Sequence, residues 1–177
     1  MYFIKHHFGG LELINLLAND KEKVRERMMA SDAIFCFGGN TEYLKAVFDK
    51  TGFSGILPDL LETKIWCGSS AGSMVIGYMP SEKLSSDLWG GTPQASTDTY
   101  GIDKYLELVP LCILPHLYGG DLMRDSRDAS VVENSTTMAV PIYALSDWSA
   151  VLVDGNETRV IGHDWSVLKN GEIIQKG

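Results

Sequence analysis

Apolar runs alternate along the chain with segments whose apolar residues recur at helical spacing, and this alternation predicts a mixed α/β protein. Residues 33–37 form a continuous apolar run closed by two glycines, which is typical of a strand buried in a parallel sheet. Val24 and Met28 lie four residues apart behind Asp20, a good helix-capping residue, and so predict a helix over 20–30. The same reasoning predicts strands at 11–17, 33–37, 64–67, 111–114, 142–145, 150–153, 159–162 and 172–175, and further helices at 41–48, 56–61, 74–76 and 125–134.

The order of these elements predicts the topology. Strands and helices alternate up to the strand at 142–145, and such β-α-β units form parallel sheets through right-handed crossovers. Two turn signals follow, Asp154-Gly155-Asn156 and Asn170-Gly171, which are typical of hairpins. We therefore expect one domain over 1–177: a doubly wound, mostly parallel α/β sheet with a C-terminal antiparallel hairpin edge. The stretch from 78 to 100, rich in Ser, Gly and Thr, predicts a functional loop or lid.

Composition and charge narrow the possible functions. The formal net charge of −8 argues against nucleic-acid binding, which usually needs a basic face. We find no apolar run long enough to cross a membrane and no signal peptide. Cys36, Cys67 and Cys112 all lie in apolar runs, so we expect buried thiols in a reducing cytoplasm. No cluster of Cys and His has the spacing of metal ligands, and neither a metal nor a cofactor is expected.

The segment around Ser70 carries the clearest chemical signal. Gly68, Ser70 and Gly72 form a Gly-x-Ser-x-Gly motif between an apolar run and a predicted helix, and this strand-turn-helix setting is that of a nucleophile elbow. The flanking glycines permit a strained turn, and the helix N-terminus places its positive dipole end beside the hydroxyl. The alternatives are a glycine-rich turn without chemistry or a phosphate cradle. The second lacks the Gly-Lys-Ser/Thr sequence of a phosphate loop.

A serine nucleophile needs a base and an acid that orients the base. His116 follows the predicted strand at 111–114, so it would lie at the same sheet edge as Ser70, although a strand-end histidine can also simply bond a backbone carbonyl. His163 lies in the hairpin region and is expected on the surface. For the acid, Asp147 follows the strand at 142–145 and Asp87 lies in the long loop; either could instead cap a turn.

An oxyanion hole would complete such a site. Its first donor is expected to be the backbone amide of Ala71, the residue after the nucleophile. The second is expected from the loop at 38–41, at Gly39 or Asn40, because glycine lets a backbone approach closely. The alternative for this loop is an ordinary glycine turn with Asn40 as a helix cap.

Three ordered blocks, Gly38-Gly39-Asn40-Thr41, Gly68-x-Ser70-Ala71-Gly72 and Leu114-Pro115-His116, make the sequence resemble peptidase E, the dipeptidase E family of serine peptidases. The resemblance runs from about residue 11 to the end of the chain. It implies a flavodoxin-like fold related to class I glutamine amidotransferases, and hydrolysis of dipeptides with an N-terminal aspartate. Ser70 then matches the nucleophile and His116 the base.

The resemblance implies two placements for the family's acid, one in the loop after the nucleophile and one at a later strand end. Asp87 matches the first placement and Asp147 the second. We favour Asp147, because a strand end is more rigid than a loop.

The sequence departs from the family in two places. Family members that prefer aspartyl substrates carry an arginine about a dozen residues after the nucleophile, whereas this chain has no arginine between Arg27 and Arg124. Family members also have some fifty or more residues before the segment that matches Leu11. A sheet short of its first strands exposes apolar surface, so the chain is expected to form a homodimer or to insert residues 1–8 as a substitute strand. We favour the dimer because residues 1–8 are too polar for a central strand.

Three functions remain open at this point. The first is a serine hydrolase that cleaves small peptides, without a preference for aspartate. The second is a non-catalytic relative that binds a small ligand or a protein partner. The third is an amidotransferase-like domain, but that class has cysteine at the elbow, whereas here Ser70 stands there and Cys67 comes three residues too early.

Overall fold

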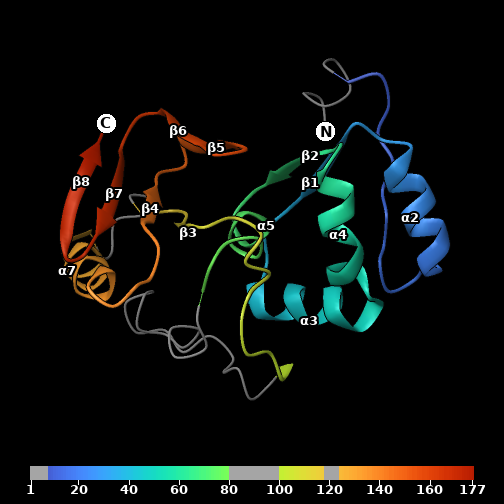
Figure 1. Ribbon diagram of the computed structural model, residues 1–177, viewed down its shortest axis with the longest axis horizontal. Helices are drawn as coiled ribbons and strands as arrows, with labels where there is room; N and C mark the ends of the chain where they lie inside the picture. The colour runs from blue at the N-terminus through green and yellow to red at the C-terminus, as the bar shows by residue number, and fades with distance from the viewer. Residues whose placement is uncertain (1–7, 80–99, 118–123) are drawn as a thin grey trace.

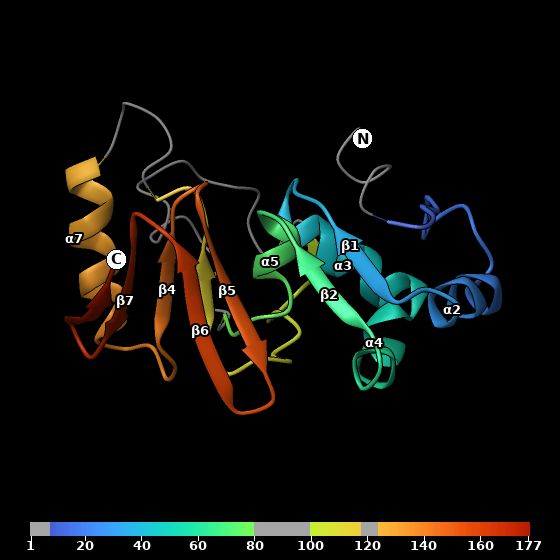
Figure 2. The ribbon, with the colours of Figure 1, turned by 90° about the horizontal axis from the view of Figure 1, so that it is seen from above.

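The structure is a computed structural model that describes residues 8–79, 100–117 and 124–177. Its elements form two groups, and the short helix α5 (Ala71–Met74) lies between them in both views (Figure 1, Figure 2). The first group comprises the helices and strands of residues 21–68, and the second comprises the strands and the helix of residues 112–176. The segment that follows the predicted elbow therefore joins the two groups.

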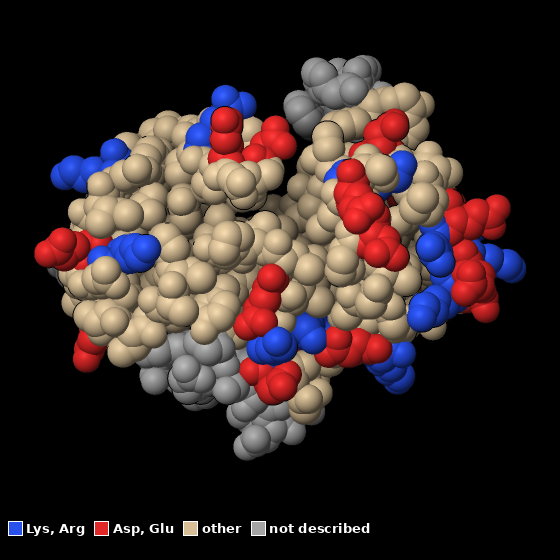
Figure 3. All heavy atoms as spheres, in the orientation of Figure 1, with Lys and Arg blue, Asp and Glu red and all other residues tan. Residues whose placement is uncertain are grey.

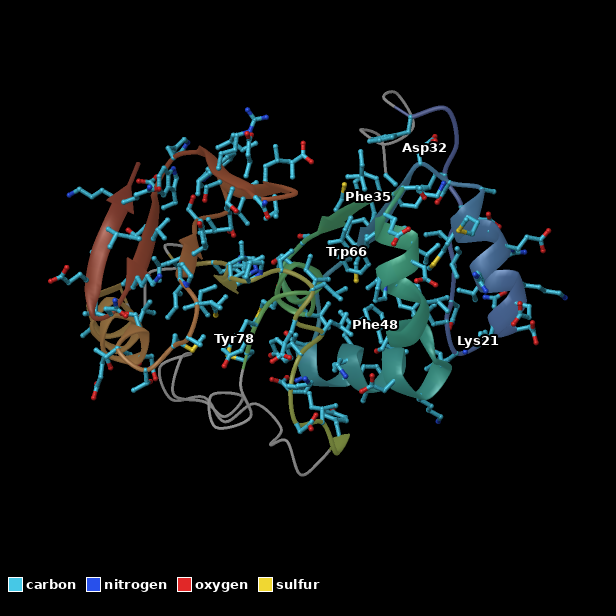
Figure 4. All side chains as sticks on the ribbon, viewed as in Figure 1. Lys21, Asp32, Phe35, Phe48, Trp66 and Tyr78 are labelled. Carbon is cyan, nitrogen blue, oxygen red and sulfur yellow. The ribbon has the colours of Figure 1, made fainter. Side chains whose placement is uncertain are left out.

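The first group is a parallel strand pair packed against helices. Strand β1 (Ala33–Cys36) pairs with β2 (Ile65–Gly68) in register Ala33 to Ile65. Helices α2 (Lys21–Met29), α3 (Thr41–Thr51) and α4 (Phe53–Leu61) complete the group. Phe48 on α3 meets Trp66 on β2 edge to face, with ring centroids 6.3 Å apart; both are labelled in Figure 4. The buried core of this group consists of Val24, Met28, Ile34, Phe48, Phe53, Leu57, Leu60 and Val75.

The helix ends follow local sequence rules. Asp20 caps α2, as predicted, by accepting a hydrogen bond from the Glu22 amide. Asn40 caps α3 in the same way, by accepting from the Tyr43 amide at 2.6 Å. Gly52 then ends α3 in the left-handed conformation (φ 74°), where glycine carries no steric penalty, and α4 begins at the next residue.

The second group is a mixed sheet covered by a helix. Strand β3 (Cys112–Leu114) pairs in parallel with β4 (Ile142–Leu145), which pairs antiparallel with β7 (Trp165–Lys169), followed by β8 (Glu172–Lys176). Helix α7 (Arg124–Ser135) packs against β7 and β8. A separate hairpin is formed by β5 (Ser149–Asp154) and β6 (Glu157–Gly162). Both predicted hairpins are therefore confirmed, whereas β7 was missed.

The predicted strand at 11–17 is wrong. These residues form no strand, and Asn15 instead closes a turn by accepting hydrogen bonds from the amides of Leu17 and Ala18. Ile14 and Leu16 pack against the buried core of the first group. Two apolar residues of this run therefore cover the core without pairing with a strand, while Leu11, Leu13 and Leu17 are exposed.

The two groups are joined through the segment that leaves α5. The Tyr78 amide donates to the Leu111 carbonyl at 2.8 Å, and a Cβ on Gly77 would lie 2.8 Å from that same oxygen. Met74 on α5 and Leu114 on β3 belong to one buried cluster. The elbow helix is thus packed against the strand that leads to His116.

The strands of the described residues lie in three sheets, with orders β1-β2, β3-β4-β7-β8 and β5-β6. The mixed α/β class and the parallel pairs are confirmed, while a single doubly wound sheet stays a prediction. Across residues 8–79, 100–117 and 124–177, none of the helices combines the length and the apolar character needed to span a membrane.

The β1–β2 pair leaves apolar side chains exposed. Phe37, just after β1, is 62% exposed, and Ile65 on β2 is 64% exposed. Phe8 meets Phe35 edge to face at 5.3 Å and covers part of β1. Residues 1–7 lie outside the described part of the chain. The homodimer expected from this exposed surface stays a prediction.

Candidate active site

Ser70 occupies a strained turn between β2 and α5. Its backbone angles are φ 53° and ψ −122°, a conformation that a residue with a Cβ rarely adopts. The turn is held by the Ser69 amide, which donates to the Cys36 carbonyl at 2.9 Å, and by the Ser73 hydroxyl, which donates to the Ser70 carbonyl at 2.7 Å. A serine held in this way between a strand and a helix N-terminus has the geometry expected of the predicted nucleophile elbow.

The two glycines of the motif are there for steric reasons. A Cβ on Gly68 would lie 2.3 Å from the Gly72 carbonyl oxygen, and a Cβ on Gly72 would lie 2.1 Å from the Cys36 carbonyl oxygen. Both contacts are far inside van der Waals distance and involve backbone atoms that cannot swing away. The elbow therefore requires glycine at both positions.

The loop after β1 lies directly against the serine. A Cβ on Gly38 would be 2.9 Å from the Ser70 Cβ and 3.1 Å from its Oγ, so the bare backbone of Gly38 faces the hydroxyl. Gly39 follows with φ 140°, which favours glycine. The amides of Gly39 and Ala71 donate to none of the other described residues. These two amides are the candidate oxyanion donors, whereas the Asn40 side-chain oxygen caps α3 by accepting from the Tyr43 amide.

His116 and Asp147 lie at the ends of neighbouring parallel strands. The ring Nδ1 of His116 is hydrogen-bonded to Oδ1 of Asp147. The Leu117 amide donates to the Leu145 carbonyl at 3.1 Å and fixes the loop after β3 against the end of β4. With Nδ1–H donating to the carboxylate, Nε2 is the ring atom left with the lone pair of a base.

The turn that carries Asp147 is itself fixed by hydrogen bonds. Ser146 is buried, and its Oγ donates to the His163 carbonyl at 2.7 Å and accepts from the Trp148 amide at 3.1 Å. His116 has φ 62°, so its backbone is held in the left-handed region. His163, predicted on the surface, is exposed and bonds Asp164. Asp87, the other predicted acid, lies outside the described residues.

Comparison with known proteins assigns the chain to a family. A sequence model described as peptidase family S51 matches residues 2–161. The chain belongs to peptidase family S51. The predicted resemblance to peptidase E is thereby confirmed.

A solved relative supports the fold of this S51 chain. The crystal structure of a candidate peptidase E from Listeria monocytogenes EGD-e superposes with a TM-score of 0.64 at 22% sequence identity. The match covers 86% of this chain and 70% of the Listeria chain. At this identity the likeness is one of fold. No curated protein matches the sequence.

A buried acid that the sequence did not reveal follows the loop of the candidate site. Glu42, in the first turn of α3, is 3% exposed, and its Oε1 accepts from the Tyr105 hydroxyl at 3.2 Å. Its Oε2 has no hydrogen-bond partner among the described residues. Burial, first of all, raises the pKa of Tyr105, so this hydroxyl stays protonated and keeps donating. Glu42 is thus a buried carboxyl in the turn that follows the loop of the candidate oxyanion donors.

The candidate site does not coincide with the cavity of the first group. A cavity of about 300 Å³ lies among residues 16–24 and 50–56, and none of the predicted catalytic or oxyanion residues lines it. Among the described residues no group of three or more His, Cys, Asp or Glu side chains could hold a metal ion. The candidate site is therefore recognised by the arrangement of its side chains and backbone amides.

The three cysteines of the S51 chain are free and chemically quiet. Burial raises the pKa of Cys36 to about 11 and that of Cys112 to about 12, and it raises the pKa of Cys67 as well. A raised pKa keeps a thiol protonated at neutral pH, and only the thiolate is a nucleophile.

We therefore expect iodoacetamide at pH 8 to modify Cys36 about 100-fold more slowly than an unperturbed thiol, as follows from a shift of about two pKa units. The modification rate should climb continuously as the pH rises toward 11. Mass spectrometry of timed samples measures both rates. Rapid modification of Cys67 at pH 7, with loss of activity, would support a cysteine nucleophile instead of Ser70.

Proposed function

We propose that this protein is a serine peptidase that cleaves small peptides through Ser70, His116 and Asp147. The observation that carries the proposal is the hydrogen bond between His116 Nδ1 and Asp147 Oδ1 at the edge of two parallel strands. A glycine-rich turn without chemistry would have no need of such an oriented imidazole. Membership of a peptidase family supports the same reaction class.

In the proposed reaction, Ser70 Oγ attacks the peptide carbonyl while Nε2 of His116 takes its proton. The carbonyl oxygen becomes negative and is stabilised by the amides of Gly39 and Ala71. When the C–N bond breaks, His116 returns the proton to the leaving amine, and an acyl-enzyme on Ser70 remains. Water, deprotonated by His116, then attacks the acyl group, the bond to Ser70 Oγ breaks, and His116 returns the proton to that oxygen as the acid leaves. Asp147 orients the imidazole and stabilises its charged form throughout.

We also propose that β1 to β4 correspond to the flavodoxin-like sheet of the peptidase E fold. Asn40 is proposed as a further contact to the oxyanion. A preference for N-terminal aspartate is not proposed, because the chain has no arginine between Arg27 and Arg124 to grip a carboxylate.

The proposal is tested by labelling with a fluorophosphonate, which reacts with activated serines. The unmodified protein should be labelled at Ser70, and Ser70→Ala protein should not be labelled. A folded protein that resists labelling and hydrolyses no dipeptide would instead favour the non-catalytic, ligand-binding alternative.

Asp147→Asn is expected to lower kcat by roughly 10²-fold with little change in KM, because the acid fixes the imidazole tautomer needed in the transition state. Because His116 and Asp147 are half-exposed, we expect a smaller loss of kcat than for the removal of a buried acid. Steady-state kinetics on a dipeptide measures both constants. Asp87→Asn is the matched control and should change kcat by less than about threefold. Small and equal losses for the two variants would mean that Ser70 and His116 act without an acid.

A further inference from the structure

Trp148 is a large aromatic side chain left in solvent beside the proposed catalytic acid. It directly follows Asp147 and is 73% exposed. Single exposed apolar residues are common on protein surfaces, but a tryptophan is among the least favourable to leave there. Its surroundings show whether this one is a loose surface residue or a fixed one.

The backbone around Trp148 is held from both sides. Its amide donates to Ser146 Oγ at 3.1 Å, and its carbonyl accepts from the His163 amide at 3.4 Å. Gly162 has φ 95°, and a Cβ there would lie 2.0 Å from the Trp148 carbonyl oxygen. Only glycine lets the end of β6 approach this closely, so the fold fixes the tryptophan at the edge of the site.

The His163 ring flanks the indole, and most of the Trp148 surface stays open. The His163 ring stacks on Trp148 with centroids 6.2 Å apart and an interplanar angle of 15°. Since the residue is nevertheless 73% exposed, an open face of the indole is available to a ligand.

The charge beside this face is negative. The segments next to Trp148 contain two carboxylates, Asp147 and Asp164. Apart from these and the two imidazoles, residues 115–117, 146–149 and 162–164 carry no titratable side chain. Lysines and arginines gather elsewhere, many of them over α2, at the right of the view in Figure 3. Each of these carboxylates is bonded to one of the imidazoles, and no lysine or arginine of these segments offsets their charge, so the edge of the site favours cations over carboxylates.

We propose that the open face of Trp148 forms the wall of a substrate subsite for a flat side chain, either an aromatic ring or a guanidinium. Both pack on an indole face, and the neighbouring carboxylates favour the cation. An acidic side chain is disfavoured there. The subsite deepens the proposed function and rests on it for its role in substrate selection.

Binding is measured first, so that the test does not depend on turnover. Ser70→Ala protein is titrated with dipeptides that differ in one residue, Arg, Phe, Gly or Asp, and tryptophan fluorescence is recorded. Arg and Phe peptides should bind about 10- to 100-fold more tightly than the Gly peptide, with Asp the weakest. Adding Trp148→Ala should abolish this preference, measured by calorimetry, and Trp148→Phe should keep part of it.

Ile161→Ala is the matched control. This residue is an apolar side chain on β6, 54% exposed, in the same hairpin region, and its removal should leave the preference intact. Thermal melts of all variants check that the fold is kept. Equal affinities for the four peptides, no binding at all, or a preference that survives Trp148→Ala would overturn the subsite.

Kinetics with intact Ser70 separates the two proposals. The same order of preference should appear in kcat/KM, mostly through KM, because the wall binds ground state and transition state alike. A binding preference without any hydrolysis would leave the subsite standing and reject the peptidase. Equal kcat/KM values for the four dipeptides would reject the subsite but support the peptidase activity.

Discussion

Protein carrying Ser70→Ala is expected to lose dipeptide hydrolysis by at least roughly 10³-fold while keeping its fold. The substitution removes only Oγ, and alanine suffers the same backbone strain at φ 53° as serine, so the turn is not relieved. The hydrogen bond from the Ser73 hydroxyl to the Ser70 carbonyl is unaffected. Initial rates with a dipeptide, together with circular dichroism, measure both parts of the expectation.

Ser69→Ala is the matched control for this prediction. Ser69 precedes the elbow, is exposed, and contributes its backbone amide to the turn. Its removal should change the rate by less than about twofold, since surface substitutions away from special features have small effects. Full activity in Ser70→Ala protein would rule Ser70 out as the nucleophile.

Gly72→Ala is expected to destabilise the protein by about 3 kcal/mol or more. The new methyl group would lie 2.1 Å from the Cys36 carbonyl oxygen, so β1 and α5 would have to move apart. That movement would also strain the bond from the Ser69 amide to the same carbonyl. Urea denaturation monitored by tryptophan fluorescence gives the free energy of unfolding.

Gly55→Ala supplies the opposite control. Gly55 lies inside α4 with no atom within 4 Å of the position a Cβ would take. Alanine there should raise the free energy of unfolding by roughly 0.5–1 kcal/mol, because glycine is a poor helix residue. If both variants destabilised the protein equally, the close approach of Gly72 to β1 would not be the cause.

Local sequence rules predicted much of the fold. The capping residue Asp20 and the turn Asn170-Gly171 were placed correctly because their effects depend on the nearest few residues. The failures concern partners that are distant in sequence. Residues 11–17 are as apolar as a strand, but Ile14 and Leu16 pack against the core of the first group and the segment pairs with no strand. Strand β7 was not predicted, and it forms by pairing with β4 and β8, of which β4 lies about twenty residues away.

For the site, the sequence predicted candidate residues but not their contacts. Asp147 could be favoured from its place after a strand, and the structure pairs it with His116. The backbone of Gly38 against Ser70 and the bond between Tyr105 and Glu42 could not be foreseen, because each joins segments more than thirty residues apart. Trp148 gave no signal either, since its fixed position depends on Gly162 and His163.

Ser70 and His116 both have positive φ angles, so their proposed catalytic roles come at a cost in stability. Each such residue costs on the order of 1–3 kcal/mol, against a total stability of roughly 5–15 kcal/mol for a typical domain. Glycine at either position would relieve that strain and remove the proposed catalytic group with it. A chain selected for stability alone would therefore drift toward glycine at both positions, and any engineering of this protein for heat resistance must leave these two strained residues alone.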